Sequence, residues 1–462
     1  MNLINEYSKY SYAILGAGRS GVGIAKFLHN RGIKVFLSES NSEEKIEKEF
    51  LELLRNKNIE FETGKHSDKI FDYDIIVKSP GIPMWNELIL QLKNAGKKVI
   101  GELELSYLFC KCPVIAVTGT NGKTTTVNLI GEIFTNAGFD TKVCGNVGLA
   151  FSEILDDINE NSIVILETSS YQLYDTELFK PKVSVFLNFT EDHLYWHKTM
   201  DNYFDAKMKI TGNQDIKDLF IYNYDDEFIK NNLYKYQILA MKSAFTLSNG
   251  LDDESLLTGC YLNSGFICYF DNSKNENSKI IKKDQLQIKG HHNIANSMAA
   301  ILTAKRFNIE DEIIKETLKN FKGVEHRIEF IREINGVKIY NDSKATNPDS
   351  TLVALKSFPG KIILIMGGMK MNVNFEIIKM EILDKVKKII AIGESKQDIF
   401  NFFEHLVPVE LAFDLNEAIY YSLNSCRSGD IILFSPSYKS FDMFKDFEHR
   451  GNEFKKLINA IN

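Results

Sequence analysis

Short apolar runs alternate with amphipathic, helix-like stretches along the first hundred residues of the chain. Runs of branched apolar residues predict strands at 12–15, 34–37, 75–77 and 99–100. The stretches between them predict helices at 22–30 and 43–56. Strands and helices that alternate in this way build βαβ units on a parallel sheet, so we expect a Rossmann-like α/β domain here.

The same alternation returns twice further along the chain. A second block extends from about 114 to 321, and its polar stretch at 243–284 is expected to form an antiparallel excursion. In a third, again Rossmann-like block, apolar runs predict strands at 361–366, 388–392 and 430–434, followed by a charged helix at 441–461. The 462 residues suffice for about three domains, which we place at 1–110, 111–322 and 323–462.

Composition and charge exclude several classes of protein. The formal net charge of −7 argues against a general nucleic-acid binder, although it leaves room for a local basic cleft. Of the six cysteines only Cys110 and Cys112 are close together, without a second pair or a histidine at zinc-ligand spacing, so reduced thiols are expected. No apolar run approaches the roughly 18 residues of a membrane span, and the N-terminus is polar. We expect a cytoplasmic protein with neither a membrane nor a nucleic-acid partner.

The run T-G-T-N-G-K-T at 118–124 carries the strongest chemical signal. It follows an apolar strand and opens a helix, so its glycines and the helix N-terminus can surround phosphate oxygens. Lys123 can reach the outer phosphates, and the Thr124 hydroxyl can hold Mg²⁺. Val117 stands where the usual P-loop has its first glycine, so this loop is shortened, and we predict a P-loop ATPase-type domain with a mostly parallel sheet. The candidate ATP-binding residues are Gly119, Thr120, Asn121, Gly122, Lys123, Thr124 and Thr125.

A glycine-rich segment near the N-terminus indicates a second nucleotide-like ligand. Gly16, Gly18, Gly21 and Gly23 lie between a predicted strand and a predicted helix. Glu39 closes the next strand about 20 residues later, as in dinucleotide-binding folds, where the acidic residue contacts a ribose. The alternative is that the glycines serve only a tight turn and close helix packing.

Three residues of the middle block could belong to a metal site. Glu167 closes the apolar run 163–166, where a carboxylate binds Mg²⁺ or caps the next turn. His193 follows the strand 183–187 and either ligates a metal, orients a phosphate or makes a structural hydrogen bond. Lys207 lies in a helix-like stretch, either as a solvated surface charge or as a lysine drawn into the site.

Polar residues further along the chain likewise have either a structural or a ligand-binding interpretation. Asn293 precedes an alanine-rich helix and is either a helix-start group or an ATP contact. Arg327 lies near the start of the third block, and Asp342 and Lys344 follow a predicted strand in the same block. Basic groups presented from a second domain can neutralise charge that develops during phosphoryl transfer. Ordinary polar side chains of a surface hairpin are the alternative.

Seven motifs, taken in this order, resemble those of the Mur ligase family of ATP-dependent amide-bond-forming enzymes. They are T-G-T-N-G-K-T at 118–124, C-G-N-V-G at 144–148, E-T-S-S-Y-Q-L at 167–173, N-F-T-E-D-H at 188–193, H-N at 292–293, H-R at 326–327 and N-D-S-K-A-T-N at 341–347. K-S-P-G-I at 78–82 and S-P-S-Y-K-S-F-D-M-F at 435–444 extend the resemblance over nearly the whole chain. Each motif alone is weak, whereas seven in order are specific.

The resemblance implies a role for each matching residue. The implied catalytic residues are Lys123, Glu167, His193, Lys207 and Lys344. The nucleotide would also contact Asn293, Arg327 and Asp342. One Mg²⁺ ion would be held by Thr124 and Glu167, and a second by His193 and a carbamylated Lys207 that offers oxygen ligands. The N-terminal fingerprint would then hold UDP rather than NAD. The implied substrate-binding residues are Gly18, Ser20, Glu39, Ser79, Gly81, Asn146, His326, Thr346, Lys370, Ser440 and Phe441.

The reaction implied by the resemblance is the addition of D-glutamate to UDP-N-acetylmuramoyl-L-alanine through an acyl phosphate, with ATP consumed, in peptidoglycan precursor synthesis. The alternatives are another Mur-type ligase, a folylpolyglutamate ligase, an NAD-dependent oxidoreductase and a non-catalytic nucleotide-binding protein. Two departures from the family pattern stand out. The segment 194–197, Leu-Tyr-Trp-His, replaces an acidic-basic pair after His193, and Lys370 falls one residue earlier than the usual lysine.

Overall fold

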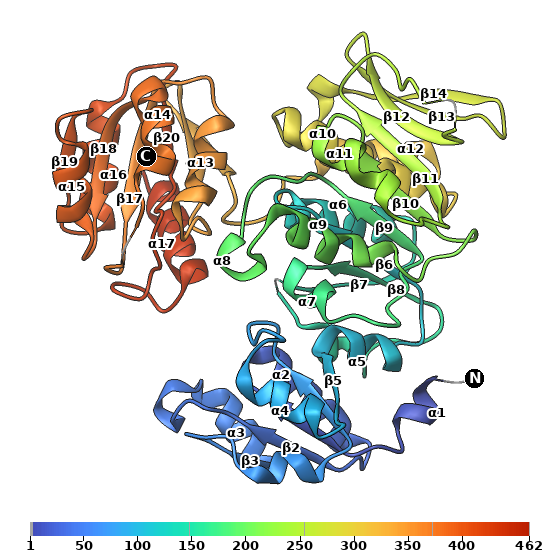
Figure 1. Cartoon of the computed structure of the whole chain (residues 1–462). Coiled ribbons are helices and arrows are strands. Elements are labelled where there is room, and N and C mark those ends of the chain that lie inside the picture. Colours follow the sequence, from blue (N-terminus) through green and yellow to red (C-terminus); the bar gives the residue numbers. More distant parts are fainter. Residues whose placement is uncertain (1–2, 147, 254, 372, 462) are drawn as a thin grey trace. The chain divides into compact units, whose positions relative to one another are not determined.

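The computed structural model describes residues 3–146, 148–253, 255–371 and 373–461, so Val147 of the C-G-N-V-G motif lies outside the described residues. The chain divides into two compact units, Met1–Phe321 and Lys322–Asn462. The first unit holds two sheets and the second holds one, and helices accompany each sheet (Figure 1). This arrangement confirms the predicted α/β class, whereas the exact domain limits stay a prediction.

The N-terminal sheet has five parallel strands in the order β3-β2-β1-β4-β5. The strands are β1 (Tyr12–Leu15), β2 (Val35–Ser38), β3 (Glu60–Glu62), β4 (Ile75–Lys78) and β5 (Lys98–Gly101). The helices are α1 (Leu3–Tyr7), α2 (Arg19–Asn30), α3 (Lys48–Asn56), α4 (Glu87–Asn94) and α5 (Glu102–Phe109). The strand order reverses between β1 and β4, and in such sheets ligands bind at the carboxyl ends of the strands beside the reversal.

One predicted helix of this domain is interrupted. Instead of a single helix at 43–56, the chain forms a 3₁₀ turn at Glu43–Lys45 and then α3. Between them Ile46 is extended, and its side chain is buried in the core. Burial of this apolar residue therefore outweighs the local helix preference. The short strand β3 escapes prediction because two of its three residues are glutamates.

The central sheet has nine strands in the order β14-β13-β12-β11-β10-β9-β6-β8-β7. The strands are β6 (Val114–Thr118), β7 (Asp140–Gly145), β8 (Ser162–Glu167), β9 (Val183–Phe186), β10 (Leu219–Asn223), β11 (Met241–Thr246), β12 (Thr258–Asn263), β13 (Phe266–Asp271) and β14 (Glu276–Lys282). The helices are α6 (Lys123–Asn136), α7 (Ser170–Tyr174), α8 (Leu194–His197), α9 (Met200–Met208), α10 (Glu227–Asn232), α11 (His291–Arg306) and α12 (Asp311–Asn320). Pairing is antiparallel from β12 to β14, as predicted, but β11 at the start of that segment pairs in parallel with both neighbours.

A continuous apolar core joins the two sheets of the first unit. It includes Ile14 and Val77 of the N-terminal sheet together with Ala116 and Leu166 of the central sheet. Leu105 of α5, the helix that leads from one sheet to the other, belongs to the same cluster. Because this shared core excludes water from both sheets at once, they form one compact unit rather than two independent ones.

The second unit has a six-stranded sheet in the order β15-β16-β20-β17-β18-β19. The strands are β15 (Glu329–Ile334), β16 (Val337–Asn341), β17 (Ile362–Gly367), β18 (Val386–Ile392), β19 (Val409–Leu411) and β20 (Ile431–Phe434). The helices are α13 (Pro348–Lys356), α14 (Glu376–Lys385), α15 (Lys396–Phe403), α16 (Leu415–Ser425) and α17 (Phe447–Asn459). The helix predicted at 441–461 begins only at Phe447, because the carboxylate of Asp446 caps it by accepting a hydrogen bond from the N–H of His449.

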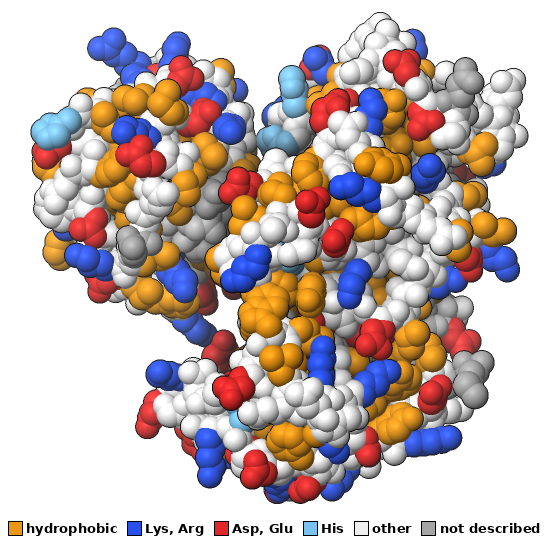
Figure 2. Space-filling view, viewed as in Figure 1, with side chains coloured by type: hydrophobic (Ala, Val, Ile, Leu, Met, Phe, Trp, Pro, Cys, Tyr) orange, Lys and Arg blue, Asp and Glu red, His pale blue; other side chains and the backbone are white. Residues whose placement is uncertain are grey.

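Charged side chains of both signs are interspersed over the face drawn in Figure 2. Apolar side chains lie between them, and no continuous basic stripe crosses this face. Among the helices of the described residues, none combines the length and the apolarity that a membrane crossing requires.

Candidate active site

The phosphate loop connects the end of β6 to the start of α6. Gly119 and Gly122 have φ angles of +149° and +85°, which favour glycine. A Cβ atom on Gly122 would lie 2.6 Å from Oδ1 of Asn296 in α11. Glycine is therefore favoured at position 122 by backbone conformation, and a larger residue would also displace the Asn296 amide. Thr124 and Thr125 follow in the first, largely buried turn of α6, where the helix N-terminus favours anions.

Asn188, which follows β9, closes the phosphate loop from the other side. Its Oδ1 accepts a hydrogen bond from the N–H of Asn121 at 2.8 Å, and its Nδ2 donates to the carbonyl of Asn121 at 3.0 Å. The carbonyl of Asn188 also accepts from the N–H of Thr120 at 3.0 Å. These three bonds hold the loop open for a ligand. Asn188 belongs to a recognised motif, but the motif alone does not reveal this clamping role.

Two lysine amines converge on one carbonyl of the loop. Nζ of Lys123 donates to the carbonyl of Gly119 at 2.9 Å, and Nζ of Lys207 in α9 donates to the same carbonyl at 2.8 Å. Lys207 is only 1% exposed. Burial lowers the pKa of Lys207 well below its usual range, and the positive charge of Lys123 lowers it further. Lys207 therefore lies beside the phosphate loop, in surroundings that favour the neutral form of its amine.

Glu167 presents a carboxylate oxygen that lacks a partner. Oε1 accepts from Nδ2 of Asn146 at 3.3 Å, whereas Oε2 is buried without a hydrogen-bond partner among the described residues. Glu167 pairs with Val117 across β8 and β6, so the acid lies beside the start of the phosphate loop. A buried, uncompensated carboxylate oxygen is costly unless a cation neutralises it. The arrangement fits a metal ligand.

His193 opens α8 with a left-handed φ of +56°. Its Nε2 lies 3.2 Å from Oδ2 of Asp192, and its ring centroid lies 4.9 Å from that of Tyr171. The side chain is partly exposed. An imidazole oriented by a carboxylate is a typical metal ligand, and the same contact also suits a purely structural histidine.

His197, at the end of α8, is a buried histidine that the sequence patterns did not single out. Its Nε2 lies 2.9 Å from Oγ of Ser170, and its ring stacks on that of Tyr171. Burial lowers the pKa of His197 to about 4, with smaller contributions from the neighbouring His193 and Lys207. His197 therefore stays neutral at physiological pH and cannot act there as a cationic phosphate ligand.

Asn293 lies in the first turn of α11. Its Nδ2 donates to the carbonyl of Lys289 at 2.8 Å, and its Oδ1 accepts from Nδ2 of Asn296 at 3.1 Å. Because Asn296 lies against Gly122, this chain of contacts links Asn293 to the phosphate loop. Asn293 is thus both a helix-start group and a neighbour of the candidate ATP site.

The predicted UDP-sugar residues gather at the carboxyl ends of β1, β2 and β4. Glu39 accepts from the N–H of Ala17 at 2.8 Å and from that of Asn41 at 2.7 Å. Burial alone would raise the pKa of Glu39. These hydrogen bonds outweigh burial and lower the pKa below its usual value. Oγ of Ser79 donates to the carbonyl of Leu15 at 2.9 Å. The other predicted residues at this edge are Gly18, Ser20 and Gly81.

In the second unit, the predicted residues follow β16, β20 and β17, which are neighbours in the sheet. Asp342 is buried; its Oδ2 accepts from Oγ of Ser435 at 2.7 Å and its Oδ1 from the N–H of Ile328 at 3.2 Å. Burial raises the pKa of Asp342 to about 7, although the Ser435 hydrogen bond and the charge of Arg327 oppose it. Asp342 thus fastens two strand-end segments to each other.

Arg450 of α17 holds the segments after β16 and β20 through buried hydrogen bonds. Its guanidinium donates to the hydroxyl of Ser343 at 3.0 Å, to the carbonyl of Ser343 at 2.7 Å and to the carbonyl of Tyr438 at 3.0 Å. The side chain is 1% exposed, and burial lowers its pKa to about 10. Arg450 was not predicted as a site residue because in sequence it is one charge among several in an amphipathic helix.

Two predicted substrate residues of the second unit are buried. The ring Nδ1 of His326 lies 2.9 Å from Nδ2 of Asn341, and the N–H of His326 donates to Glu329 at 2.9 Å. Burial lowers the pKa of His326. Ser440 is likewise 2% exposed. The side chain of His326 thus bonds within its own unit, and the backbone carbonyl of Ser440 accepts from the N–H of Met443 at 3.2 Å and of Phe444 at 2.9 Å.

Four other predicted residues of this unit are more accessible. Lys344 and Thr346 are half-buried, whereas Lys370 and Phe441 are exposed. Nζ of Lys370 lies 3.6 Å from Oδ2 of Asp398. The N–H of Met369, next to Lys370, donates to the carbonyl of Lys439 at 2.9 Å, so the loops after β17 and β20 touch.

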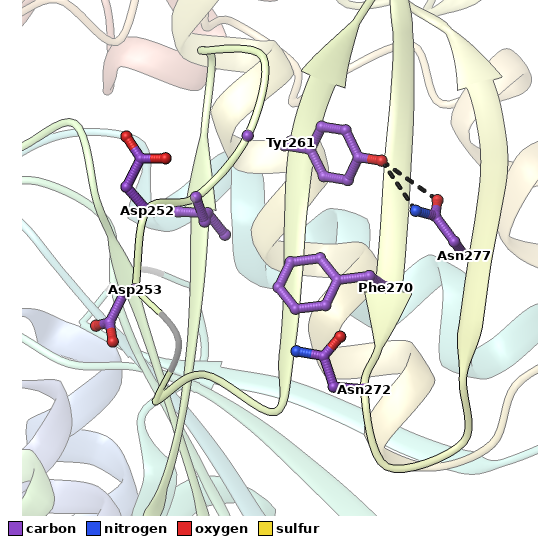
Figure 3. A pocket seen from close by; sticks show the side chains of 8 residues that line it. Asp252, Asp253, Tyr261, Phe270, Asn272 and Asn277 are labelled. Atoms are coloured by element: carbon purple, nitrogen blue, oxygen red, sulfur yellow. Dashed lines mark hydrogen bonds between the residues drawn. The ribbon is translucent and has the colours of Figure 1, made fainter.

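A separate hollow of about 560 Å³ lies over strands β12 to β14 (Figure 3). The hydroxyl of Tyr261 and the amide of Asn277 form hydrogen bonds across it, and two carboxylates, Asp252 and Asp253, lie at its edge. None of the predicted site residues lines this hollow. We therefore assign it no part in the site built around Gly119.

Comparisons with known proteins identify the family of the chain. Residues 12–88 match the MurD N-terminal domain, 117–304 the Mur ligase middle domain and 326–438 the Mur ligase glutamate ligase domain. The UDP-N-acetylmuramoylalanine–D-glutamate ligase of Clostridioides difficile is 39% identical over 97% of this chain and 98% of its own length. The ligase of the same name from Caldicellulosiruptor saccharolyticus is 37% identical over 97% and 98% of the two chains.

Solved structures share the fold. The MurC ligase of Thermotoga maritima superposes with a TM-score of 0.57 at 18% identity, covering 98% of this chain and 99% of its own. The MurF ligase of the same organism, solved with ADP, gives a TM-score of 0.58 at 16% identity, covering 92% and 96%. The full-length relatives leave no place for the NAD-dependent oxidoreductase alternative. Sequence motifs, site geometry and relatives thus agree that this chain belongs to the Mur ligase family of ATP-dependent, amide-bond-forming enzymes.

Proposed function

We propose that this enzyme adds D-glutamate to UDP-N-acetylmuramoyl-L-alanine in the cytoplasm, as a step of peptidoglycan precursor synthesis. Its full-length similarity to ligases of that name supports the choice of substrates. The observation that carries the chemistry is the buried amine of Lys207, 2.8 Å from the phosphate-loop carbonyl of Gly119. We assign the UDP-sugar to residues 1–110, ATP to 111–322 and the amino acid to 323–462.

The reaction must first activate a carboxylate, which is a poor electrophile because its oxygen is a poor leaving group. A carboxylate oxygen of the L-alanyl group attacks the γ-phosphorus of ATP, the bond to the bridging oxygen breaks, and ADP leaves. The D-glutamate amine then attacks the carbonyl carbon of the acyl phosphate. The tetrahedral intermediate loses phosphate, and the amine loses a proton. Lys123 and Lys344 provide fixed positive charge for these steps.

Two Mg²⁺ ions belong to this proposal, one held by Thr124 and Glu167 and one by His193 and Lys207. The unpartnered, buried Oε2 of Glu167 supports the first site. Bound Mg²⁺ supplies Lewis-acid neutralisation of phosphate charge. In the described part of the chain no group of three or more His, Cys, Asp or Glu side chains is placed to hold a metal ion. The two proposed sites add other donors to Glu167 and His193, namely a hydroxyl and a modified lysine.

Carbamylation of Lys207 would provide that missing donor. A neutral amine attacks CO₂, an N–C bond forms, and one proton leaves, so the lysine becomes an oxygen-bearing anion. Burial, and then the charge of Lys123, lowers the pKa of Lys207 well below its usual range, which favours the reactive, neutral form of the amine. The modification would also place a negative charge beside the ammonium group of Lys123, which attracts it.

The remaining predicted residues are assigned to substrates by the same division of the chain into three domains. We propose that Asn146 contacts the acceptor near its reacting carboxylate and that Asn293, Arg327 and Asp342 contribute to nucleotide binding. The amino acid is assigned to the loops of the second unit, whose predicted contacts are His326, Lys344, Thr346, Lys370, Ser440 and Phe441. The accessibility of Lys370 and Phe441 supports direct contact. The burial of His326 and Ser440 favours support of the loop backbone.

The test is ATP-dependent phosphate release with UDP-N-acetylmuramoyl-L-alanine and each of four amino acids. D-glutamate is compared with L-glutamate, meso-diaminopimelate and L-lysine. We expect release with D-glutamate alone. Release with a different amino acid would keep the ligase chemistry but refute the proposed substrate, and release with none would refute the proposed activity.

A further inference from the structure

The loop between β4 and α4, residues 79–86, contains Ser79 and Gly81, which the proposed function assigns to the UDP-sugar. Few bonds within the loop hold it in shape. The N–H of Ile82 donates to the carbonyl of Ser79 at 3.0 Å, and the N–H of Asn86 donates to the carbonyl of Pro83 at 3.0 Å. Ser79 also bonds the carbonyl of Leu15, and Ile82 and Met84 pack on the core of the N-terminal domain. Two contacts with the central domain add to these.

The first contact is a fully buried ion pair. Lys78, the last residue of β4, has no exposed surface, and its Nζ bonds both the carbonyl of Ile82 at 2.6 Å and Oδ2 of Asp175. Asp175 directly follows α7 in the central domain. Its other oxygen, Oδ1, is buried without a hydrogen-bond partner in the described part of the chain. One ammonium group thus fastens the loop to the end of α7, and Asp175 depends on it for compensation.

The second contact is aromatic and lies at the other end of the loop. The rings of Trp85 and Trp196 are 4.9 Å apart, centroid to centroid. Trp196 of α8 is 6% exposed and also packs edge-on against Tyr171 and Tyr174 of α7, at 5.0 and 5.1 Å. Trp85 is still 44% exposed, so it reaches the central domain from the surface. The Lys78 end of the loop therefore contacts the end of α7 directly, and the Trp85 end contacts α7 through Trp196.

Helix α7 also adjoins the metal site. It begins at Ser170, three positions after Glu167, and Ser169 caps it by accepting from the N–H of Gln172 at 3.3 Å. A displacement of α7 would therefore move the segment that carries Glu167. Helix α7 therefore connects the loop 79–86 to the segment that carries the Glu167 carboxylate.

On these contacts, and on the proposed function, we propose that Lys78 and Trp85 are positioning residues that brace the UDP-sugar loop against α7. They act through the loop and touch neither ATP nor the reacting atoms. The brace sets the distance between the acceptor carboxylate and the site at Glu167. Its loss should weaken use of the UDP-sugar and leave the use of ATP nearly intact.

The experiment compares the KM values of UDP-N-acetylmuramoyl-L-alanine and ATP in Lys78→Met, Trp85→Ala and Trp85→Phe. We expect the KM for the UDP-sugar to rise about tenfold in the first two variants, with the KM for ATP changed less than about twofold. Trp85→Phe keeps a ring against Trp196 and should restore near wild-type values. Lys305→Met is the matched control, because Lys305 also loses ion pairs in the first unit, with Glu276 and Asp311, and does not touch the loop.

A double variant tests whether the effect of Lys78→Met comes only from misfolding. Lys78→Met combined with Asp175→Leu removes both buried charges, so it should fold while still lacking the brace. A folded double variant or Trp85→Ala with an unchanged KM for the UDP-sugar, or with equal changes for both substrates, overturns the proposal.

Hydrogen exchange of the amides in 79–86 needs no substrate and separates this proposal from the proposed function. Exchange should be faster in Lys78→Met and Trp85→Ala than in wild type or Lys305→Met. Unchanged exchange overturns the brace even if the enzyme is active. Faster exchange in an enzyme that shows no ligase activity supports the brace and refutes the proposed reaction.

Discussion

The phosphate loop of the first unit and the strand-end loops of the second unit both present polar groups at the carboxyl edge of a mostly parallel sheet, but they are held in different ways. Around Gly119 the side chains proposed for catalysis also hold the loop, because Lys123 and Lys207 both donate hydrogen bonds to its carbonyl. In the second unit Arg450 and Asp342 are buried behind the loops, while Lys370 is left exposed. The first region is a preformed site, and the second is a buried support for exposed contact groups. Substitutions should therefore affect activity most in the first region and stability most in the second.

The largest effect is expected for Lys207→Ala. This change removes the buried amine beside Gly119, and with it the proposed carbamate, so kcat should fall by about a thousandfold or more. Phosphate release measures it, with exposed Lys235, also replaced by alanine, as the control. Added bicarbonate should not rescue the variant, since the amine is absent. Turnover like that of wild type would remove the carbamate from the mechanism.

Glu167→Gln should separate activity from stability. We expect kcat to fall by about a hundredfold to a thousandfold and the requirement for Mg²⁺ to rise, because the amide is a weaker metal ligand. The thermal midpoint without metal should stay equal or increase, since the change removes a buried, unpartnered charge. A variant that is both inactive and clearly less stable would show that Glu167 is structural.

Asp342→Asn should alter the pH dependence of the second unit's stability. Burial raises the pKa of Asp342 from 3.8 to about 7, so between these values the folded state binds a proton that the unfolded state has released. The free energy of unfolding should therefore fall as pH rises from about 4 to about 7, by at most about 4 kcal/mol from this group, and level off above it. Hydrogen exchange at α13 and β20 at several pH values measures this slope. The slope should shrink in the asparagine variant, and an identical slope would contradict the burial of a titrating Asp342.

Lys370→Ala should have the smallest effect on folding. Its ion pair with Asp398 is exposed, and such pairs contribute less than about 1 kcal/mol. If Lys370 binds the amino acid, the KM for D-glutamate should rise without a change in the thermal midpoint. A change in the midpoint with an unaltered KM would place Lys370 in the scaffold and weaken the contrast between the two regions.

Residues that are close in sequence account for most of what could be predicted. A strand, a glycine-rich turn and a helix start follow one another at 114–124, so their order alone places Lys123 and Thr124 at a helix N-terminus. The carboxyl ends of neighbouring parallel strands also meet at one edge, which brings Glu167 to the loop. For Lys207 the sequence left two possibilities, and only the packing of α9 shows that its amine is buried.

Contacts over long sequence separations could not be predicted from patterns. Arg450 bonds Ser343 across 107 residues, and Lys78 meets Asp175 across 97. Each of these side chains is polar, so hydropathy predicts a surface position for it. Burial becomes favourable only when the partner is already in place, and that information lies in the fold rather than in any short segment.

The crowding at Gly122 has a genetic consequence. Every single-base change that alters a glycine codon and still encodes a residue adds a side chain with at least a Cβ atom. At position 122 that atom would meet Asn296 at 2.6 Å, on a backbone whose φ of +85° already disfavours side chains. An inhibitor that rests on this stretch of backbone would thus face a codon at which every missense change is penalised, and resistance should arise more readily elsewhere in the gene.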